Sequence, residues 1–370
     1  MNDGPAPGLI RRFLTARIEE GWMPGAAWWV EGPRGPIESG AVGWAAVEPE
    51  RVPLDEQTPF DLASLTKPLC SALLLALLES EERLDPQQPV TTWLDGMLGS
   101  AFSRVSLLEL ASHVGRLPAW RPLYLHASDG SGYVEQIARE VPAVPAGETL
   151  YSDLGYVLLG LAIEQATGQR LDKLFRERVG GPLGNPRIGF AMGDYADAAA
   201  TERGNAYERR MTGTDGISHP WRIAVLRGQV HDANAWGLGG VASHAGLFGT
   251  VEATAIVARA ILRAEKLPLV GRAHRRLLRA TAGADGRTVG MVTAAHSGAA
   301  RGILPRSAPG HTGFTGTSVW LDPQADRFFV LLTNRVHPEV ERRDFQRLRR
   351  GFHRLAIRVA GSAESALPLE

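Results

Sequence analysis

The chain has 370 residues, which is long enough to bury a large core in one two-lobed unit or in two domains. Hydrophobic residues make up 44% and charged residues 22%, as in ordinary globular proteins, and forty basic residues balance forty acidic ones. Because no net charge remains, no overall field would recruit nucleic acid or an anionic membrane, and the single cysteine, Cys70, excludes an intramolecular disulfide.

The N-terminus carries no basic segment followed by an apolar one, so no secretory leader is recognised there. The apolar run from Leu69 to Leu78 is too short to span a membrane. We therefore expect a cytoplasmic location for the chain as it stands, and a periplasmic or secreted one if a leader has been removed.

The first part of the chain predicts a helix followed by a β-hairpin. Residues Leu9 to Glu20 place their apolar side chains on one side of a helix. The runs Ala26 to Val30 and Ile37 to Ala46 are strand-like and flank a turn at Gly32 to Gly35.

The middle of the chain is mainly helical in pattern. The clearest predicted helices are Ser106 to His113, Tyr133 to Glu140, Leu154 to Thr167 and Val251 to Ala264. We expect a helical lobe over residues of about 86–286, in which His113 is a hydrogen-bonded core residue.

Strand patterns return near the C-terminus, at Ser318 to Leu321 and Arg327 to Thr333. The stretch from Arg342 to Arg358 follows as a basic amphipathic helix, which we interpret as having a solvated arginine face rather than a nucleic-acid surface.

Strands at both ends and helices between them predict an α/β fold of the α+β type. An antiparallel sheet from both termini would be flanked by helices and would carry an inserted all-helical lobe. We expect one catalytic domain over residues 1–370, with an α/β lobe of about 1–85 and 287–370.

Ser64 and Lys67 lie three residues apart at the expected start of the apolar helix, so their hydroxyl and amine would share a face. Only three of the forty basic residues are lysines, and a lysine can lose its proton where an arginine cannot. The pair is therefore a candidate activated serine. The alternative is a helix cap at Ser64 and a solvated Lys67.

Tyr151 precedes a predicted helix, and a phenol held there beside a cation could serve as a general base. The alternative is that Ser152 or Asp153 only caps the helix and Tyr151 packs.

The stretch His311 to Ser318 leads into the strand that ends at Leu321. Gly313 and Gly316 would allow another backbone to approach closely, and an amide there could face a developing oxyanion. The alternative is a glycine-rich start of a strand.

Taken in order, Ser64-x-x-Lys67, Tyr151-x-Asp153 and His311-Thr312-Gly313 resemble the three elements of the serine β-lactamase and penicillin-binding protein superfamily. The likeness is greatest to the class C branch, which includes D,D-carboxypeptidases, D-amino-acid peptidases and esterases. It covers nearly the whole chain and is also carried by the stretches Phe60 to Pro68, Leu107 to His113 and Tyr151 to Tyr156.

The resemblance implies that Ser64 is acylated by an ester or amide and that Lys67 and Tyr151 share its proton. It also implies an oxyanion hole from the backbone amides of Ser64 and Phe314, with Thr312 and Gly313 at the substrate. Which of Lys67 and Tyr151 is the base stays open, because coupled groups titrate as a pair.

We expect an esterase or peptidase for a small-molecule or peptide substrate rather than a true β-lactamase. The alternative is a catalytically silent binding protein on the same fold. The oligomeric state is left unassigned.

Two residues depart from the family pattern. Asp153 replaces the usual asparagine and could hold Lys67 charged, which would shift the base role to Tyr151. His311 replaces the usual lysine, so its positive charge is expected to depend on pH and to hold a substrate carboxylate less well above neutrality.

A further stretch, Gly228 to Ala235, looks like a segment of relatives that carry His-Thr-Gly. Its His231 and Asp232 are interpreted as structural or substrate-facing. There is no helix-spaced pair of metal ligands, and the implied serine mechanism needs no cofactor, so we expect neither metal nor cofactor.

Overall fold

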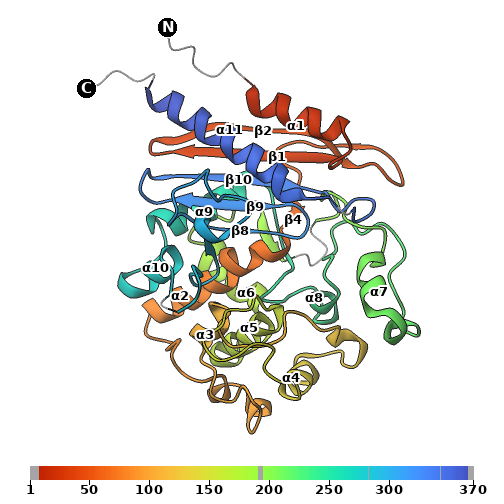
Figure 1. Ribbon diagram of the computed structural model, residues 1–370, viewed down its shortest axis with the longest axis vertical. Coiled ribbons are helices and arrows are strands. Elements are labelled where there is room, and N and C mark those ends of the chain that lie inside the picture. Colours follow the sequence, from red (N-terminus) through yellow and green to blue (C-terminus); the bar gives the residue numbers. More distant parts are fainter. Residues whose placement is uncertain (1–7, 191–194, 282, 342, 366–370) are drawn as a thin grey trace.

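The computed structural model describes residues 8–190, 195–281, 283–341 and 343–365. A seven-stranded antiparallel sheet runs in the order β3-β2-β1-β10-β9-β8-β7 (Figure 1). Its strands are β1 (Gly25–Gly32), β2 (Gly35–Ala46), β3 (Val52–Pro53), β7 (Val292–Thr293), β8 (Pro309–Thr312), β9 (Ser318–Asp322) and β10 (Arg327–Thr333).

The centre of the sheet joins the two ends of the chain. Ala26 of β1 lies opposite Thr333 of β10, and Trp29 opposite Val330, while the other edge of β1 pairs with β2. The predicted antiparallel sheet assembled from both termini is therefore confirmed.

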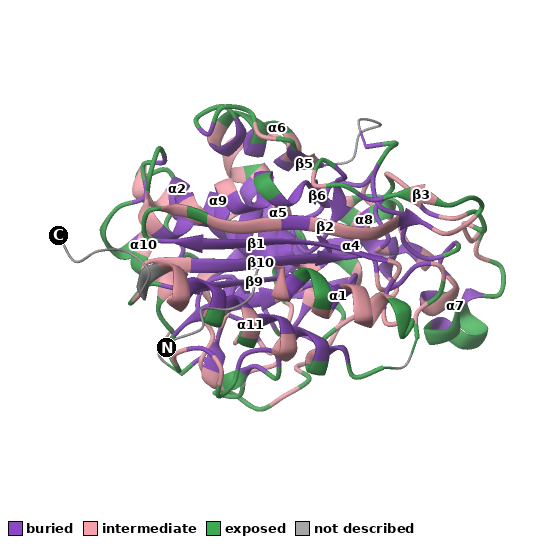
Figure 2. Cartoon of the chain, turned by 90° about the horizontal axis from the view of Figure 1, so that it is seen from above, coloured by how far each residue is buried: buried purple, intermediate pink, exposed green. Residues whose placement is uncertain are grey.

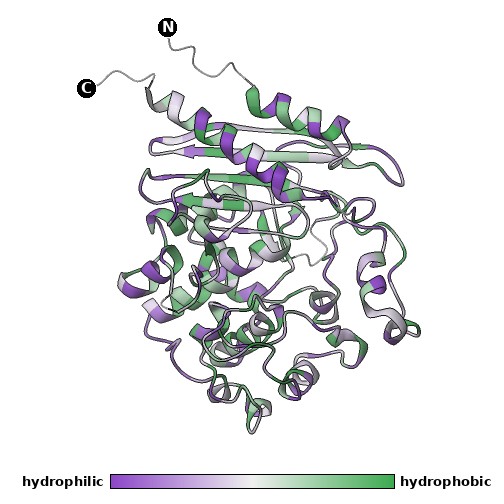
Figure 3. Cartoon of the chain, viewed as in Figure 1, coloured by the Kyte–Doolittle hydropathy of each residue, from purple (hydrophilic) through white to green (hydrophobic). Residues whose placement is uncertain are grey.

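Helices cover both faces of this sheet. Helices α1 (Leu9–Glu19) and α11 (Phe345–Ser365) lie side by side on one face (Figures 1 and 2). Hydrophilic and apolar residues are interspersed along α11 (Figure 3), and its buried residues Phe345, Leu348, Phe352, Ala356 and Val359 recur every three or four positions, as an amphipathic helix requires. On the opposite face α9 (Val251–Arg263) contacts β1, β9 and β10. Although α9 falls in the range predicted for the helical lobe, it packs on the sheet.

Because both faces are covered, neighbouring side chains of one strand enter two different cores. Ala27 and Trp29 of β1 join the larger core, which extends into the helical lobe. Trp28 and Val30 join the core beneath α1 and α11. This explains why β1 is apolar at almost every position instead of alternating.

The remaining helices form the lobe that faces the end of the sheet formed by β8 and β7 (Figure 1). They are α2 (Leu73–Ser80), α3 (Leu107–Ala111), α4 (Gly130–Ala138), α5 (Asp153–Thr167), α6 (Leu171–Phe175), α7 (Ala206–Thr212), α8 (Ala233–Gly237) and α10 (Gly271–Leu278). A small antiparallel sheet that sequence patterns did not predict lies among them, in the order β4 (Phe60–Asp61), β6 (Leu247–Gly249) and β5 (Ile188–Phe190).

The segment from Ala63 to Ser80 is one apolar helical stretch of 18 residues that by length and composition alone could cross a membrane. Because 83% of it is buried inside the protein, its hydrophobicity serves the core. Ser64 lies in a 3₁₀ turn (Ala63–Leu65), and a π-helical stretch (Lys67–Ala72) separates it from α2. The predicted regular helix start is thus a locally irregular one.

Candidate active site

The candidate active site is a cleft of about 600 Å³ lined by residues of both lobes. The structure brings all ten predicted site residues together there. Nine of them line the cleft, namely Ser64, Tyr151, Asp153, His231, Asp232, His311, Thr312, Gly313 and Phe314. The tenth, Lys67, is fully buried and donates a hydrogen bond to Ser64 Oγ (3.1 Å).

The turn that carries Ser64 is held in an unusual backbone conformation. Ala63 has φ 47°, in the left-handed region that costs a residue with a Cβ about 1 kcal/mol. Its N–H donates to Asp61 Oδ1 (2.8 Å), and its carbonyl accepts from the Thr66 hydroxyl (2.7 Å). These bonds fix the nucleophile's position before any substrate arrives.

The β8–β9 hairpin is fastened to the same turn. Thr315 and Thr317 donate from their hydroxyls to the carbonyls of Asp61 (2.8 Å) and Leu62 (3.1 Å). A Cβ at Gly313 would lie 2.7 Å from the Leu62 carbonyl oxygen, so only glycine lets the two backbones come this close. The backbone around Phe314 is thereby held beside Ser64, where the predicted oxyanion hole requires it.

His311 was expected in the stretch that leads into the strand ending at Leu321, but it belongs to a strand of its own, β8. It lies opposite Val319 of β9. The other neighbour of β8 is β7, which pairs with Pro309 and Gly310 only, so His311 and Thr312 continue past it and line the cleft.

The ammonium group of Lys67 lies among several hydrogen-bond and ion-pair partners, Tyr151 among them. The others are Ser64 Oγ (3.1 Å), the His244 carbonyl (3.0 Å) and Asp153 Oδ1 (2.7 Å). Burial alone would lower the pKa of Lys67, but Asp153 and Tyr151 outweigh it and raise this pKa above its ordinary value. Asp153 therefore keeps Lys67 charged.

Tyr151 lies beside this ammonium, with its ring centroid 5.0 Å from Lys67 Nζ. Burial raises the pKa of Tyr151 above its ordinary value, while the Lys67 charge and hydrogen bonding to Lys67 and Ser64 act in the lowering direction. Ser152 caps α5 by accepting from the Gly155 N–H (3.2 Å), so the capping alternative holds for Ser152 without removing Tyr151 from the cleft.

His113 is buried, as expected, and its Nδ1 accepts from the Ser152 N–H (3.0 Å). Its ring centroid lies 4.5 Å from that of Tyr151. Burial and the nearby cations Arg287 and Lys67 hold the pKa of His113 well below its ordinary value, so it packs against Tyr151 as a neutral ring.

His311 does not supply the pH-dependent positive charge that its sequence position suggested. Burial, Lys67 and Arg287 together hold the pKa of His311 well below its ordinary value. These surroundings favour the neutral ring, which contradicts the expectation that a charge on His311 holds a substrate carboxylate and is lost above neutrality. The cations at this wall of the cleft are arginines instead.

Three arginines that sequence reasoning missed, Arg287, Arg335 and Arg349, line the sheet-side wall of the cleft. Arg287 lies over the Tyr151 ring, with Cζ 5.4 Å from the centroid. Within the described ranges none of the three forms an ion pair with a carboxylate. No motif marks them, since they are three of thirty-seven arginines and come from separate loops and helices.

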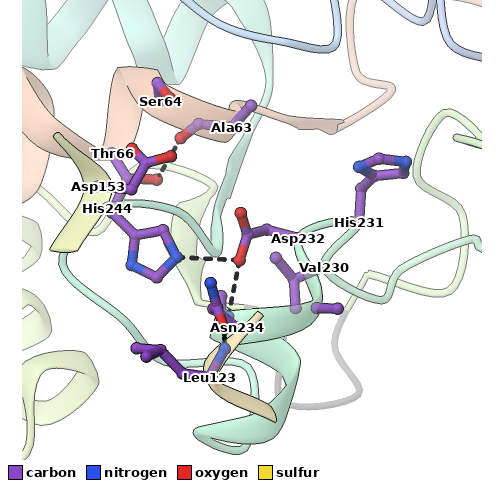
Figure 4. Close-up of polar contacts among 12 residues, drawn as sticks. Ala63, Ser64, Thr66, Leu123, Asp153, Val230, His231, Asp232, Asn234 and His244 are labelled. Carbon is purple, nitrogen blue, oxygen red and sulfur yellow. Dashed lines mark hydrogen bonds and ion pairs between the residues drawn. The ribbon is translucent and has the colours of Figure 1, made fainter. Parts of the chain in front are cut away.

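His231 and Asp232 are both at the cleft but have different partners. The His231 N–H donates to Asp61 Oδ2 (2.8 Å). Asp232 Oδ1 accepts from the Ala235 N–H (2.8 Å), which caps α8, and from His244 Nε2 (2.9 Å), leaving Oδ2 outside these contacts (Figure 4). Burial would raise the pKa of Asp232, but the His244 contact lowers it below its ordinary value.

Among the described residues no group of three or more His, Cys, Asp or Glu is placed to hold a metal ion.

A buried lysine and a tyrosine around a serine on a strained turn, in a cleft between an antiparallel sheet and a helical lobe, define a serine hydrolase of the penicillin-recognising type. Residues 10–351 match the Beta-lactamase family model, and the chain belongs to this family. The protein is a serine hydrolase related to β-lactamases.

Curated relatives and solved structures agree with this assignment. An Escherichia coli (strain K12) protein named "Putative D-alanyl-D-alanine carboxypeptidase" is 31% identical over 320 residues, or 76% of this chain and 70% of that protein. A Bacillus subtilis (strain 168) protein named "N-acetylmuramyl-L-alanine amidase" is 27% identical over 316 residues, covering 77% and 69%. The structure of "EstCE1, a hydrolase with promiscuous acyltransferase activity" shares the fold with a TM-score of 0.72 at 19% identity, covering 94% and 97%.

Proposed function

We propose that the protein is a serine peptidase of the D,D-peptidase type, whose preferred substrates carry a carboxylate close to the scissile amide or ester bond. The observation that carries the proposal is Arg287, a half-buried guanidinium over Tyr151 that has no carboxylate partner in the described chain. A charge held in a cleft without a counter-charge favours a ligand that supplies one. The names of the curated relatives support a peptide substrate.

In acylation, Ser64 Oγ attacks the substrate carbonyl and its proton passes to the Tyr151 oxygen. Because Asp153 keeps Lys67 protonated, Lys67 stabilises the developing alkoxide of Ser64 rather than removing the proton. The raised pKa of Tyr151 leaves its phenol protonated, so Tyr151 gives its own proton to the leaving group as it receives that of Ser64.

The carbonyl oxygen becomes an oxyanion during this step, and the backbone amides of Ser64 and Phe314 are proposed to stabilise it. The leaving amine or alcohol departs with the proton from Tyr151. Water then attacks the acyl-enzyme along the same path, its proton returns through Tyr151 to Ser64 Oγ, and the free acid leaves.

The test compares paired substrates that differ only in the carboxylate: an acyl-D-Ala-D-Ala peptide and its C-terminal amide, together with the corresponding pair of depsipeptide esters. We expect kcat/KM to be higher for the acids. Arg287→Met should remove about 10- to 100-fold of that preference, because a hydrogen bond to a charged group is worth about 1.5–3 kcal/mol.

Arg272→Met is the matched control, since Arg272 is an exposed arginine on α10 outside the cleft. It should leave the preference unchanged. Equal turnover of acid and amide by the wild type, or an Arg287→Met variant that still prefers the acid as strongly as the wild type, would overturn the proposal.

A further inference from the structure

The side chain of Phe314 is enclosed by groups from three other parts of the chain. The His231 ring stacks on it with centroids 5.5 Å apart and an interplanar angle of 26°. The Tyr207 ring lies 5.1 Å away, and the Arg335 guanidinium lies 5.3 Å from the ring centroid. Arg335 also donates from Nε to the Phe314 carbonyl (2.8 Å). The backbone of Phe314 is therefore oriented partly through these neighbours.

Two of these neighbours are held by one carboxylate, that of Glu202. Its Oε2 accepts a hydrogen bond from His231 Nε2 (3.0 Å), and its Oε1 accepts from the Tyr207 N–H (2.8 Å). Glu202 has no exposed surface and does not line the cleft. Its carboxylate thus reaches the cleft through the two residues that flank Phe314.

Glu202 favours the protonated form of His231. Burial alone would lower the pKa of His231, but Glu202, Glu208 and Asp61 outweigh it and raise this pKa above its ordinary value. The His231 main chain is fixed as well, because its N–H donates to Asp61 Oδ2, and the other oxygen of Asp61 holds the Ser64 turn. The ring and the backbone of His231 therefore connect the two amides of the predicted oxyanion hole.

We propose that Glu202 is a positioning residue for the oxyanion hole, and that it acts by holding His231 and Tyr207 against Phe314. This inference rests on the proposed acyl-enzyme mechanism, in which the Phe314 amide stabilises the tetrahedral intermediate. Because the oxyanion exists only in the transition state and in tetrahedral adducts, the contribution of Glu202 belongs to kcat and not to KM.

The test measures steady-state kinetics and inhibition by a boronic acid, which forms a tetrahedral adduct with the serine. Glu202→Gln keeps an acceptor for the Tyr207 N–H but loses the charge that binds His231. We expect kcat to fall about tenfold, a fraction of the loss caused by removing an oxyanion donor. The boronic acid should bind more weakly by a similar factor, while KM and binding of the carboxylic acid product change less than about twofold.

Glu31→Gln is the control for loss of a buried carboxylate. Glu31, on β1, is also without exposed surface, and it pairs with Arg259 of α9 outside the cleft. It should lower thermal stability without changing kcat or boronic acid affinity. His231→Gln provides a second variant should Glu202→Gln not fold, and it should reproduce the loss of boronic acid affinity. The double variant should be no worse than the more affected single variant, because both act through one contact.

Unchanged boronic acid affinity in a folded Glu202→Gln or His231→Gln variant would overturn the inference, as would an equal loss in Glu31→Gln. Failure of the proposed mechanism gives a different result. In that case the wild type itself would form no covalent adduct at Ser64, whatever residue stands at position 202.

Discussion

The two walls of the cleft carry opposite charges. The helical-lobe wall presents the carboxylates of Asp153, Glu208 and Asp232, whereas the sheet-side wall presents Arg287, Arg335 and Arg349. On the helical side, Asp153 is paired with Lys67 and Asp232 with His244. On the sheet side, no described carboxylate pairs with any of the three guanidinium groups.

The comparison shows which wall has its charges paired within the protein. Charges of the helical wall are balanced inside the protein, and that balance sets the protonation of Lys67. Burial and the neighbouring Asp232 even raise the pKa of Glu208 to about 7, which reduces the negative charge of this wall further. The sheet-side wall keeps uncompensated positive charge, so its natural counter-ion is the substrate.

The largest effect on activity is expected from removal of the nucleophile, because the charges of neither wall can replace it. Ser64→Ala should lower kcat by at least about 10⁴-fold, because removal of the nucleophile abolishes the acyl-enzyme route. It should also prevent the mass increase that a fluorophosphonate or a penicillin produces on the wild type. Intact-mass spectrometry measures the adduct, and Ser80→Ala, on the same helical segment, is the control.

The same variant tests the sheet-side wall on its own. Since Arg287 does not depend on the Ser64 hydroxyl, Ser64→Ala should still bind the carboxylic acid product with the wild-type Kd in calorimetry. Loss of that binding would mean that the anion site is not separate from the nucleophile.

Sequence patterns predicted the sheet, the helical lobe and the motifs around Ser64 and Tyr151 because their signals are local. The apolar runs of β1 and β10 are short and rich in strand-forming residues, and Ser64 with Lys67 and Tyr151 with Asp153 are short motifs beside helix starts. The irregular turn at Ala63 was not predictable, because its positive φ comes from contacts with Asp61 and Thr66 that only the folded chain makes.

The sheet-side wall could not be read from the sequence for a physical reason. Arg287 and Arg335 lie in loops, Arg349 lies on α11, and each enters the cleft through long-range packing. The protonation of His311 was misjudged for the same reason. Its pKa depends on the nearby Lys67 and Arg287, which are distant in sequence.

A smaller effect is expected from breaking the charge balance of the helical wall. Asp153→Asn restores the usual family residue but leaves the fully buried Lys67 without its carboxylate. We expect a loss of about 3 kcal/mol in the free energy of unfolding at pH 7, since removal of one partner strands a buried charge. Denaturant titration measures it.

The pH dependence of that loss follows from the sign of the Lys67 shift. Because the pKa of Lys67 is raised on folding, the ion pair stabilises the protein fully below the unfolded pKa of 10.5 and is lost as the pH rises through the folded pKa. The difference between wild type and Asp153→Asn should therefore be largest near neutral pH and shrink as the pH rises, because burial lowers the pKa of Lys67 in the variant and the wild-type ion pair is lost above its own folded pKa. Glu177→Gln, which breaks the exposed Lys173–Glu177 pair, should cost less than about 0.5 kcal/mol.

The smallest effect is expected from adding a further cation to the sheet-side wall. His311→Lys restores the family lysine, but the introduced ammonium would be buried near Lys67 and Arg287, the two cations that already disfavour charge on His311. With Arg287 present, kcat/KM for the carboxylate substrate should change by no more than about threefold.

In the wild type, KM for that substrate should be flat from about pH 6 to 8, because His311 stays neutral and Arg287 stays charged.

The combination with Arg287→Met decides which residue holds the anion. If Arg287 occupies the place of the family lysine, His311→Lys should recover part of the lost preference for the acid in the Arg287→Met background and add little in the wild type. This non-additivity is the signature of two residues that serve one carboxylate. Equal gains in both backgrounds would place the carboxylate at His311 instead, and the sheet-side arginines would then have to be matched by a second negative group of the substrate.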